Sequence, residues 1–205
     1  MNKKEAEDNL KFIKNLMENS TRYGDSLAGI FLFLGLSGTT ASLIASFTQI
    51  GSCCSLLNYW MSLAIAVAAT SAIVMIIKAK KGNHGMSSIY KVATSVIPPC
   101  IAGAVIGIAV SMHPTEDLKM QGIVVCLWVI LFGCALNATS FIILKGLKYL
   151  SWVYIYSGSF LIFFILRSEP NNLFHHCIMG FFFGLLFIGY SILLFLVEKK
   201  KNSES

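Results

Sequence analysis

The stretch that decides the fold is residues 121–142, QGIVVCLWVILFGCALNATSFI, which contain no charged side chain. About 20 such residues in a helix, at about 1.5 Å rise each, cross the roughly 30 Å hydrocarbon core of a bilayer. Lys119 precedes the stretch, and Lys145 and Lys148 follow it. We therefore predict a transmembrane helix here, with its more basic end in the cytoplasm.

Five more apolar stretches of similar length lie along the chain. The sequence predicts six spans, at about 26–47, 57–77, 92–112, 121–142, 149–166 and 174–197. A mean hydropathy of +0.71 with 13% charged residues is typical of a chain that lies mostly in lipid. We predict an all-α membrane protein in three parts: an amphipathic cytoplasmic or interfacial helix over 1–22, a six-helix transmembrane domain over 23–198 and a basic cytoplasmic tail over 199–205.

The positive charges predict the orientation of these spans. All Lys and Arg residues except Lys119 and Arg167 precede the first span, follow the last one, or lie between spans two and three or four and five. Because cationic loops are retained in the cytoplasm, we expect both termini there. The net charge of +6 is then a signal for membrane topology, and we expect the lipid bilayer, not nucleic acid, as the partner of these cations.

The N-terminal segment has the pattern of an amphipathic helix. Ala6, Leu10, Ile13 and Met17 recur at helical spacing among mostly polar residues. Such a helix either anchors the chain at the membrane surface or docks a cytoplasmic partner.

Small residues recur at helical spacing in four spans, where they let neighbouring helices approach closely. We expect these stripes to face other helices: Cys100, Gly103, Gly107 and Ser111; Gly180, Gly184 and Ser191; Ser62, Ala66, Ala69 and Ala72; and Cys126, Gly133, Asn137 and Ser140. Bulky Phe181, Phe182 and Phe195 are expected to face lipid, and Tyr59 and Trp60 to lie in the outer interfacial belt, with Tyr149 and Trp152 in the inner one.

Two prolines, Pro98 and Pro99, fall inside the third span. Proline removes a backbone donor and clashes with the preceding turn, so we expect a kink, either static or acting as a hinge. A transport pathway beside it would be lined by Thr94, Ser95, Asn137 and Ser140.

Titratable and metal-ligating residues gather at span ends and in the outer connectors. No Asp, Glu, Lys, Arg or His lies near the middle of a span, which argues against proton-coupled transport. A metal, if one were bound, would use imidazole and thiolate ligands of the outer face, and a disulfide from Cys53 or Cys54 to Cys177 is a second use of the same thiols. These residues lack metal-binding spacing, so we expect no metal, cofactor or catalytic group; the candidates are His113, His175, His176, Cys53, Cys54 and Cys177.

The run ALNATSFIILKGLKYLSWVYIYSG, residues 135–158, resembles spans four and five of a family of small six-span bacterial membrane proteins that has no assigned activity. Ile13, Met17, Glu18, Ser20 and Thr21 match its N-terminal helix, and Phe183, Gly184 and Leu186 its last span. The resemblance implies a bacterial inner membrane and the six-helix fold. It also implies a Glu where this chain has Tyr154 and a His where it has Phe187, so any chemistry of that pair is lost here.

The sequence thus favours a non-enzymatic integral membrane protein that associates, through helix packing, with itself or with a membrane partner. Two alternatives stay open. One is a carrier or channel for a small neutral or lipidic solute, and the other is an outer-face metal or redox protein or a membrane enzyme.

Overall fold

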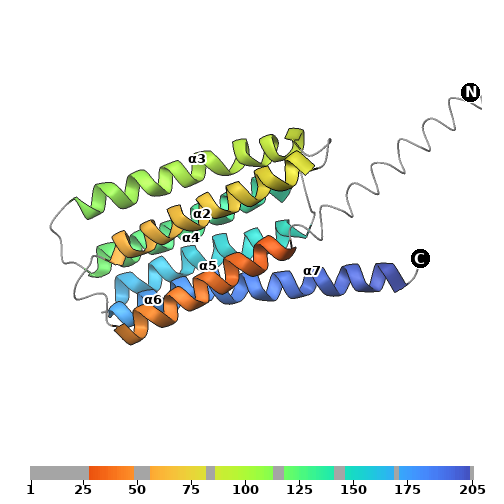
Figure 1. Ribbon diagram of the computed structural model, residues 1–205. Coiled ribbons are helices and arrows are strands. Elements are labelled where there is room, and N and C mark those ends of the chain that lie inside the picture. The colour runs from red at the N-terminus through yellow and green to blue at the C-terminus, as the bar shows by residue number, and fades with distance from the viewer. Residues whose placement is uncertain are drawn as a thin grey trace, which may run out of the picture.

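The computed structural model describes residues 28–48, 56–81, 86–112, 118–140, 146–168 and 171–203 of the 205-residue chain. Over these residues the protein forms helices, and six of them are long and apolar enough to cross a membrane (Figure 1). The prediction of an all-α, multi-pass membrane fold is confirmed. The expected amphipathic helix over 1–22 lies outside the described residues.

The observed helices match the six predicted spans, with ends that differ by a few residues. The largest differences are at the start of the third helix, Met86 where the sequence predicted 92, and at the end of the last helix, Ser203 where the sequence predicted 197. The helices are Ala28–Thr48, α2 (Leu56–Lys81), α3 (Met86–Ser111), α4 (Leu118–Ser140), α5 (Leu147–Arg167), α6 (Asn172–Gly180), the π-helical segment η2 (Phe181–Leu185) and α7 (Leu186–Ser203). The last three form one continuous sixth span, Asn172–Val197, and α7 extends beyond it into the predicted tail.

The helices form a bundle in which consecutive helices run in opposite directions (Figure 1). α4 packs along α5 on one side and along α3 on the other. α2 and α3 lie at one edge of the bundle, while the Ala28–Thr48 helix and α7 lie at the opposite edge. α4 and α5 therefore form the middle of the bundle.

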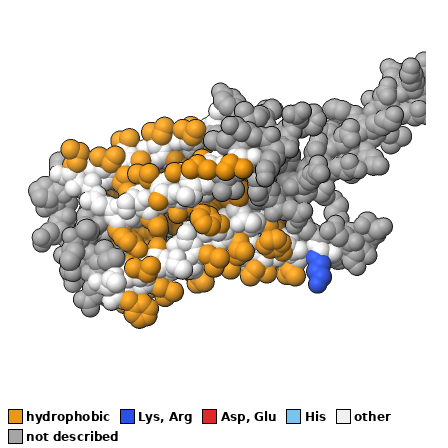
Figure 2. Space-filling model, in the orientation of Figure 1, with side chains coloured by type: hydrophobic (Ala, Val, Ile, Leu, Met, Phe, Trp, Pro, Cys, Tyr) orange, Lys and Arg blue, Asp and Glu red, His pale blue; other side chains and the backbone are white. Residues whose placement is uncertain are grey.

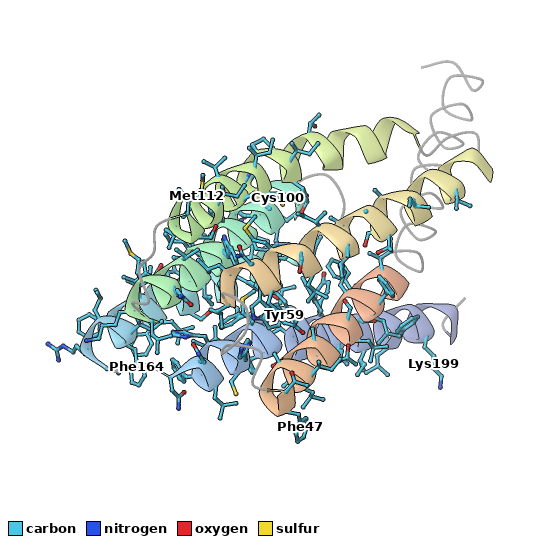
Figure 3. The ribbon with its side chains drawn as sticks, turned by 60° about the vertical axis from the view of Figure 1, so that its left-hand side comes forward. Phe47, Tyr59, Cys100, Met112, Phe164 and Lys199 are labelled. Carbon is cyan, nitrogen blue, oxygen red and sulfur yellow. The ribbon has the colours of Figure 1, made fainter. Side chains whose placement is uncertain are left out.

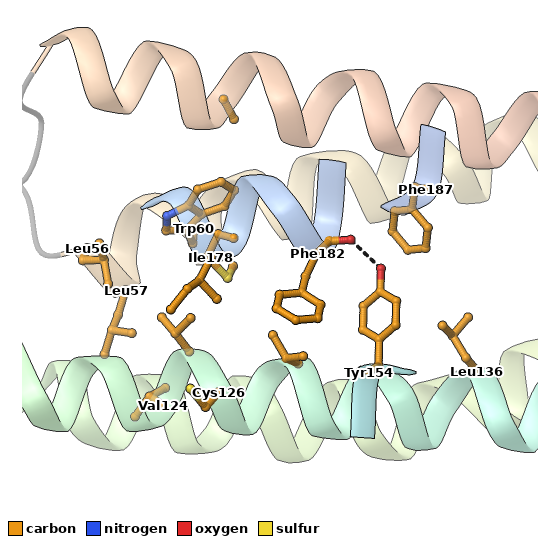
Figure 4. Close-up of a cluster of buried hydrophobic side chains, with 14 of the residues drawn as sticks. Leu56, Leu57, Trp60, Val124, Cys126, Leu136, Tyr154, Ile178, Phe182 and Phe187 are labelled. Atoms are coloured by element: carbon orange, nitrogen blue, oxygen red, sulfur yellow. Dashed lines mark hydrogen bonds between the residues drawn. The ribbon is translucent and has the colours of Figure 1, made fainter. Parts of the chain in front are cut away.

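Aromatic rings fill the space between α4, α5, α7 and the Ala28–Thr48 helix (Figure 4). The Phe187 ring is at the centre, with ring centroids 5.4 Å from Phe31, 5.5 Å from Phe132 and 6.1 Å from Tyr154. Tyr154 is 0% exposed and Phe187 is 2% exposed. These rings pack at tilted and edge angles, a geometry that adds to the stabilisation from burial.

The outer surface of the bundle is apolar over its length, with a basic side chain at one end of the face in Figure 2. Bulky side chains such as Phe160 of α5, which is 69% exposed, point away from the bundle. Tyr149 and Trp152 are exposed near the start of α5, as expected of an interfacial belt. Such a surface matches hydrocarbon and not water.

Two aromatic residues, Phe182 and Trp60, are buried, although the sequence predicted that they would face lipid and the membrane interface. Phe181 and Phe195 are exposed as expected, but Phe182 is 3% exposed. It lies in η2, where its ring packs against Tyr154 of α5 with ring centroids 5.4 Å apart. Trp60 is 2% exposed, because its indole is bonded inside the bundle.

The α-helix of α3 continues through Pro98 and Pro99, with Pro98 exposed and Pro99 half-buried. In the described chain, the departure from regular α-helix falls at Phe181–Leu185, where the sequence contains no proline.

Candidate functional site

The closest approach built from small residues joins the Ala28–Thr48 helix to the sixth span. A Cβ atom on Gly38 would overlap the backbone carbonyl of Phe183, and one on Gly184 would lie 2.9 Å from the Thr39 backbone nitrogen. Gly180 faces Ser42 in the same way. We call this contact the glycine seam; it lets two helix backbones meet as small-residue interfaces do in lipid.

Serine hydroxyls tie the two ends of the glycine seam. Ser42 Oγ donates to the His176 carbonyl at 2.8 Å, and Ser191 Oγ donates to the Ala28 carbonyl at 2.7 Å. Both serines are buried, at 8% and 0% exposure. Side-chain donors to helix carbonyls in lipid satisfy groups that no water reaches.

The π-helical segment η2 contributes Phe183 and Gly184 to the seam and carries a third hydrogen bond between helices. In η2 the Leu186 N–H donates to the Phe181 carbonyl, five residues earlier, instead of four. The Tyr154 hydroxyl donates to the Phe182 carbonyl (Figure 4). The two positions that the family resemblance marks, Tyr154 and Phe187, are in ring contact, so both belong to this aromatic centre.

A polar cluster lies at the other end of the seam, in the first turns of α2 and α6. The Trp60 indole N–H donates to His176 Nδ1 at 3.1 Å, and the Tyr59 hydroxyl donates to the Ala41 carbonyl at 2.8 Å. Because Nδ1 accepts this bond, the proton of a neutral His176 ring is on Nε2, which has no partner among the described residues. The cluster fastens α2 to α6 and to the Ala28–Thr48 helix.

His175, next along α6, points to the opposite side. It is 0% exposed, and a Cβ atom on Gly122 of α4 would overlap its Nε2 atom. The same Gly122 position lies 3.2 Å from the Ile165 Cδ1 atom of α5. Both His175 ring nitrogens are buried, and neither has a hydrogen-bond partner in the described chain.

The predicted metal ligands do not converge in the part of the chain that the structure describes. That part holds no group of three His, Cys, Asp or Glu side chains that could bind a metal ion. Cys177 of the suggested disulfide is an exposed free thiol on α6. His113, Cys53 and Cys54 lie outside the described residues.

Two glycines of the small-residue stripe on α3, Gly103 and Gly107, contact Trp128 of α4. Trp128 Nε1 donates to the Gly103 carbonyl at 2.8 Å, and a Cβ atom on Gly107 would lie 2.7 Å from the Trp128 ring. Cys100 is exposed on α3, and Ser111 bonds the Ile108 carbonyl of its own helix at 2.9 Å (Figure 3).

The residues predicted to line a polar pathway lie on α3 and α4. Asn137 Oδ1 accepts from Ser151 of α5 at 3.5 Å, and Ser140 Oγ donates to the Asn137 carbonyl at 2.7 Å. Thr94 is exposed and Ser95 half-buried on α3. Asn137 therefore takes part in the α4–α5 contact, where Gly133 also lies against Ile155 and Tyr154.

The small residues of α2 differ from the other stripes because they lie on the surface. The α2 face, as we name it, consists of Ser62, Ala66, Ala69 and Ala72, all exposed. Among the α2 side chains that the structure describes, the buried ones are near the start of the helix, where Leu56, Leu57 and Trp60 are at most 2% exposed. The internal packing of the described helices does not use this face.

The first span contains the site residues that the sequence analysis missed. Gly35, Gly38 and Ser42 occupy one helical face by their spacing of three and four. This is the same small-residue signal that was applied to four other spans, and it would have identified the seam.

Comparison with protein-family models, curated proteins and solved structures finds no match to this chain.

Proposed function

We propose that this protein is a non-enzymatic membrane subunit that works through helix association, and that its α2 face binds the α2 face of a second copy. The observation that carries the proposal is the exposure of this face. Ser62, Ala66, Ala69 and Ala72 are exposed, whereas the stripes on the sixth span and around Gly103 and Gly107 are covered by other helices of the same chain.

The surface of α5 supports this choice by contrast. The exposed side chains of α5 are mostly large: Tyr149, Trp152, Tyr156, Phe160, Phe163 and Leu166. Large side chains fill contacts with lipid tails, while small ones on a membrane helix favour contact with another helix. α2 and α5 therefore expose surfaces suited to different neighbours.

A second copy fits the α2 face because it would present the same face in the same orientation. Copies inserted with one topology run their α2 helices in parallel, and a two-fold axis along the membrane normal brings the two faces together. The sequence from Leu56 to Ile77 has no charge that would oppose such a contact. An Ala- and Ser-rich face is complementary to itself.

The centre of the bundle favours this function over a carrier or channel. Phe31, Phe132, Tyr154 and Phe187 fill the space between four helices, so a passage there would require these rings to move. The proposal includes the bacterial inner membrane as the location, with both termini in the cytoplasm, on the charge distribution and the family resemblance.

Cysteine crosslinking in native membranes tests the proposal. Ala66→Cys and Ala69→Cys, in a background that lacks the exposed native cysteines, should each form a crosslinked dimer on oxidation. Ser159→Cys is the matched control, because Ser159 is a small exposed residue of α5. Ala66→Leu should reduce the dimer measured by native mass spectrometry about tenfold, since a bulky side chain prevents close approach.

Two outcomes would overturn self-association through α2. One is a protein that does not form a dimer in native membranes. This outcome includes the case in which the Ala66→Cys variant crosslinks to a different membrane protein. The other is a dimer that crosslinks through Ser159→Cys and not through Ala66→Cys, which would place the interface on α5.

A further inference from the structure

His175 is held in a setting that suits only its uncharged form. His175 is the fourth residue of α6, which begins at Asn172, yet its side chain is 0% exposed. Its ring lies against Gly122, beside Ile165, and 6.2 Å from the Phe174 ring centroid. These neighbours are apolar or are helix backbone.

The two ring nitrogens have no acceptor for a second proton. Neutral imidazole carries one N–H and one lone pair, while imidazolium carries two N–H groups and a full charge. Neither nitrogen has a partner among the described residues. A charge buried without a partner is far more costly than a neutral polar group in the same place.

The described helices around His175 carry these charged and titratable groups. α4 contributes Lys119, one turn before Gly122; α5 contributes Arg167, two residues after Ile165; and α6 contributes His176. Tyr59 of α2 packs on His176 and not on His175. His113, Glu116, Asp117 and Glu169, in the adjoining connectors, lie outside the described residues.

α6 is fastened on one side by neutral hydrogen bonds that do not depend on the charge of His175. Asn171 Oδ1 accepts from the Phe174 N–H at 2.9 Å, Ser42 bonds the His176 carbonyl, and Trp60 bonds His176 Nδ1. The Asn171 bond caps α6, while the Trp60 and Ser42 bonds connect α6 to α2 and to the Ala28–Thr48 helix. On the side of α6 that faces α4 and α5, the contact of the first turn is made by the His175 ring, which lies against Gly122 and beside Ile165.

We propose that His175 and Gly122 form an acid-opened latch: protonation of His175 separates the first turn of α6 from α4 and α5 at this end of the bundle. The ring needs to travel only about one turn to reach the membrane surface, because α6 begins at Asn172. The Ser42 bond to the His176 carbonyl does not depend on the charge of either imidazole, so it keeps α6 attached to the Ala28–Thr48 helix while the latch is open.

Hydrogen exchange of the full-length protein in lipid nanodiscs tests the latch. Between about pH 8 and about pH 4.5, after correction for intrinsic exchange, protection of the amides at 173–178 should fall about tenfold. Protection of α5 at 150–160 should not change. In His175→Leu and in His175→Phe, which keep an apolar group on Gly122, the fall at 173–178 should be absent.

Gly122→Ala provides the opposite test, because its methyl group displaces the ring without any change of pH. This variant should show the reduced protection at 173–178 already at about pH 8. Gly189→Ala is the control, since a Cβ atom there meets nothing within 4 Å. An unchanged wild-type profile between the two pH values would overturn the latch, and so would an equal fall in both His175 variants, which would assign the effect to another group.

Discussion

The hydroxyl of Tyr154 on α5 donates a hydrogen bond to the backbone carbonyl of Phe182, in the π-helical segment of the sixth span. The phenol is completely buried between rings that leave no room for water to replace it. The bond therefore joins a helix irregularity to a side chain of a different helix (Figure 4).

Tyr154→Phe should destabilise the protein by about 1–3 kcal/mol, because the carbonyl loses its outside donor in a place without water. Unfolding of the purified protein by SDS in mixed micelles measures the change. Tyr156→Phe is the matched control, since Tyr156 is 63% exposed on the same helix. Equal stability of Tyr154→Phe and wild type would show that the bond contributes nothing.

Gly38→Ala should destabilise the protein by about 1–3 kcal/mol, the usual effect of overpacking a tight contact. A methyl group there overlaps the Phe183 carbonyl, so the two helices of the glycine seam must move apart. Gly184→Ala, against the Thr39 backbone, should behave alike. Gly189→Ala, where the space is open, should be neutral or stabilising in the same SDS titration, because alanine favours the helix. If all three variants unfold together, the seam is not a tight contact.

Trp60→Phe should destabilise the bundle by about 1–3 kcal/mol, because His176 Nδ1 loses its buried donor. A double-mutant cycle with His176→Leu separates this bond from general packing. The two substitutions should be less costly together than their sum, with a coupling of about 0.5–3 kcal/mol. Trp152→Phe, at an exposed position, should show no coupling with His176→Leu. Additive effects of the first pair would contradict the bond.

The proposed topology predicts which ends of the sixth span an impermeant maleimide reaches. Asn171→Cys, at the exposed start of α6, should be labelled in intact cells. Lys199→Cys, at the exposed end of α7, should be labelled only after the membrane is opened. Both variants need a background without Cys53, Cys54 and Cys177. The reverse labelling pattern would place the termini outside the cytoplasm.

The six spans could be predicted from the sequence because length, hydropathy and the absence of charge are properties of each segment by itself. Each observed helix overlaps its predicted range, and the small residues at Gly103, Gly107, Gly180 and Gly184 do lie in close helix contacts. A small side chain lets two helix backbones approach each other closely, so the residue type alone indicates that such a position lies in a helix contact.

The partners of those residues could not be predicted in the same way, because they depend on how helices far apart in the sequence meet. Trp60 is a residue type common at membrane interfaces and lies at the end of a span, yet its indole donates a hydrogen bond to His176, 116 residues later. His175 and His176 stand at the end of a span and are nevertheless buried. The π-helical segment has no proline or other local signal, since it is stabilised by a hydroxyl from a different helix.

The extra residue in η2 has a consequence for insertions and deletions in this chain. A π-helical turn holds one residue more than the α-helical turn it replaces, so deleting one residue from 181–185 would restore a regular helix and leave Ser191 and Gly180 on their present sides. The phenol of Tyr154 would then have no widened turn to support. Such a shortened chain should tolerate Tyr154→Phe, and the tyrosine and the surplus residue should be gained or lost together.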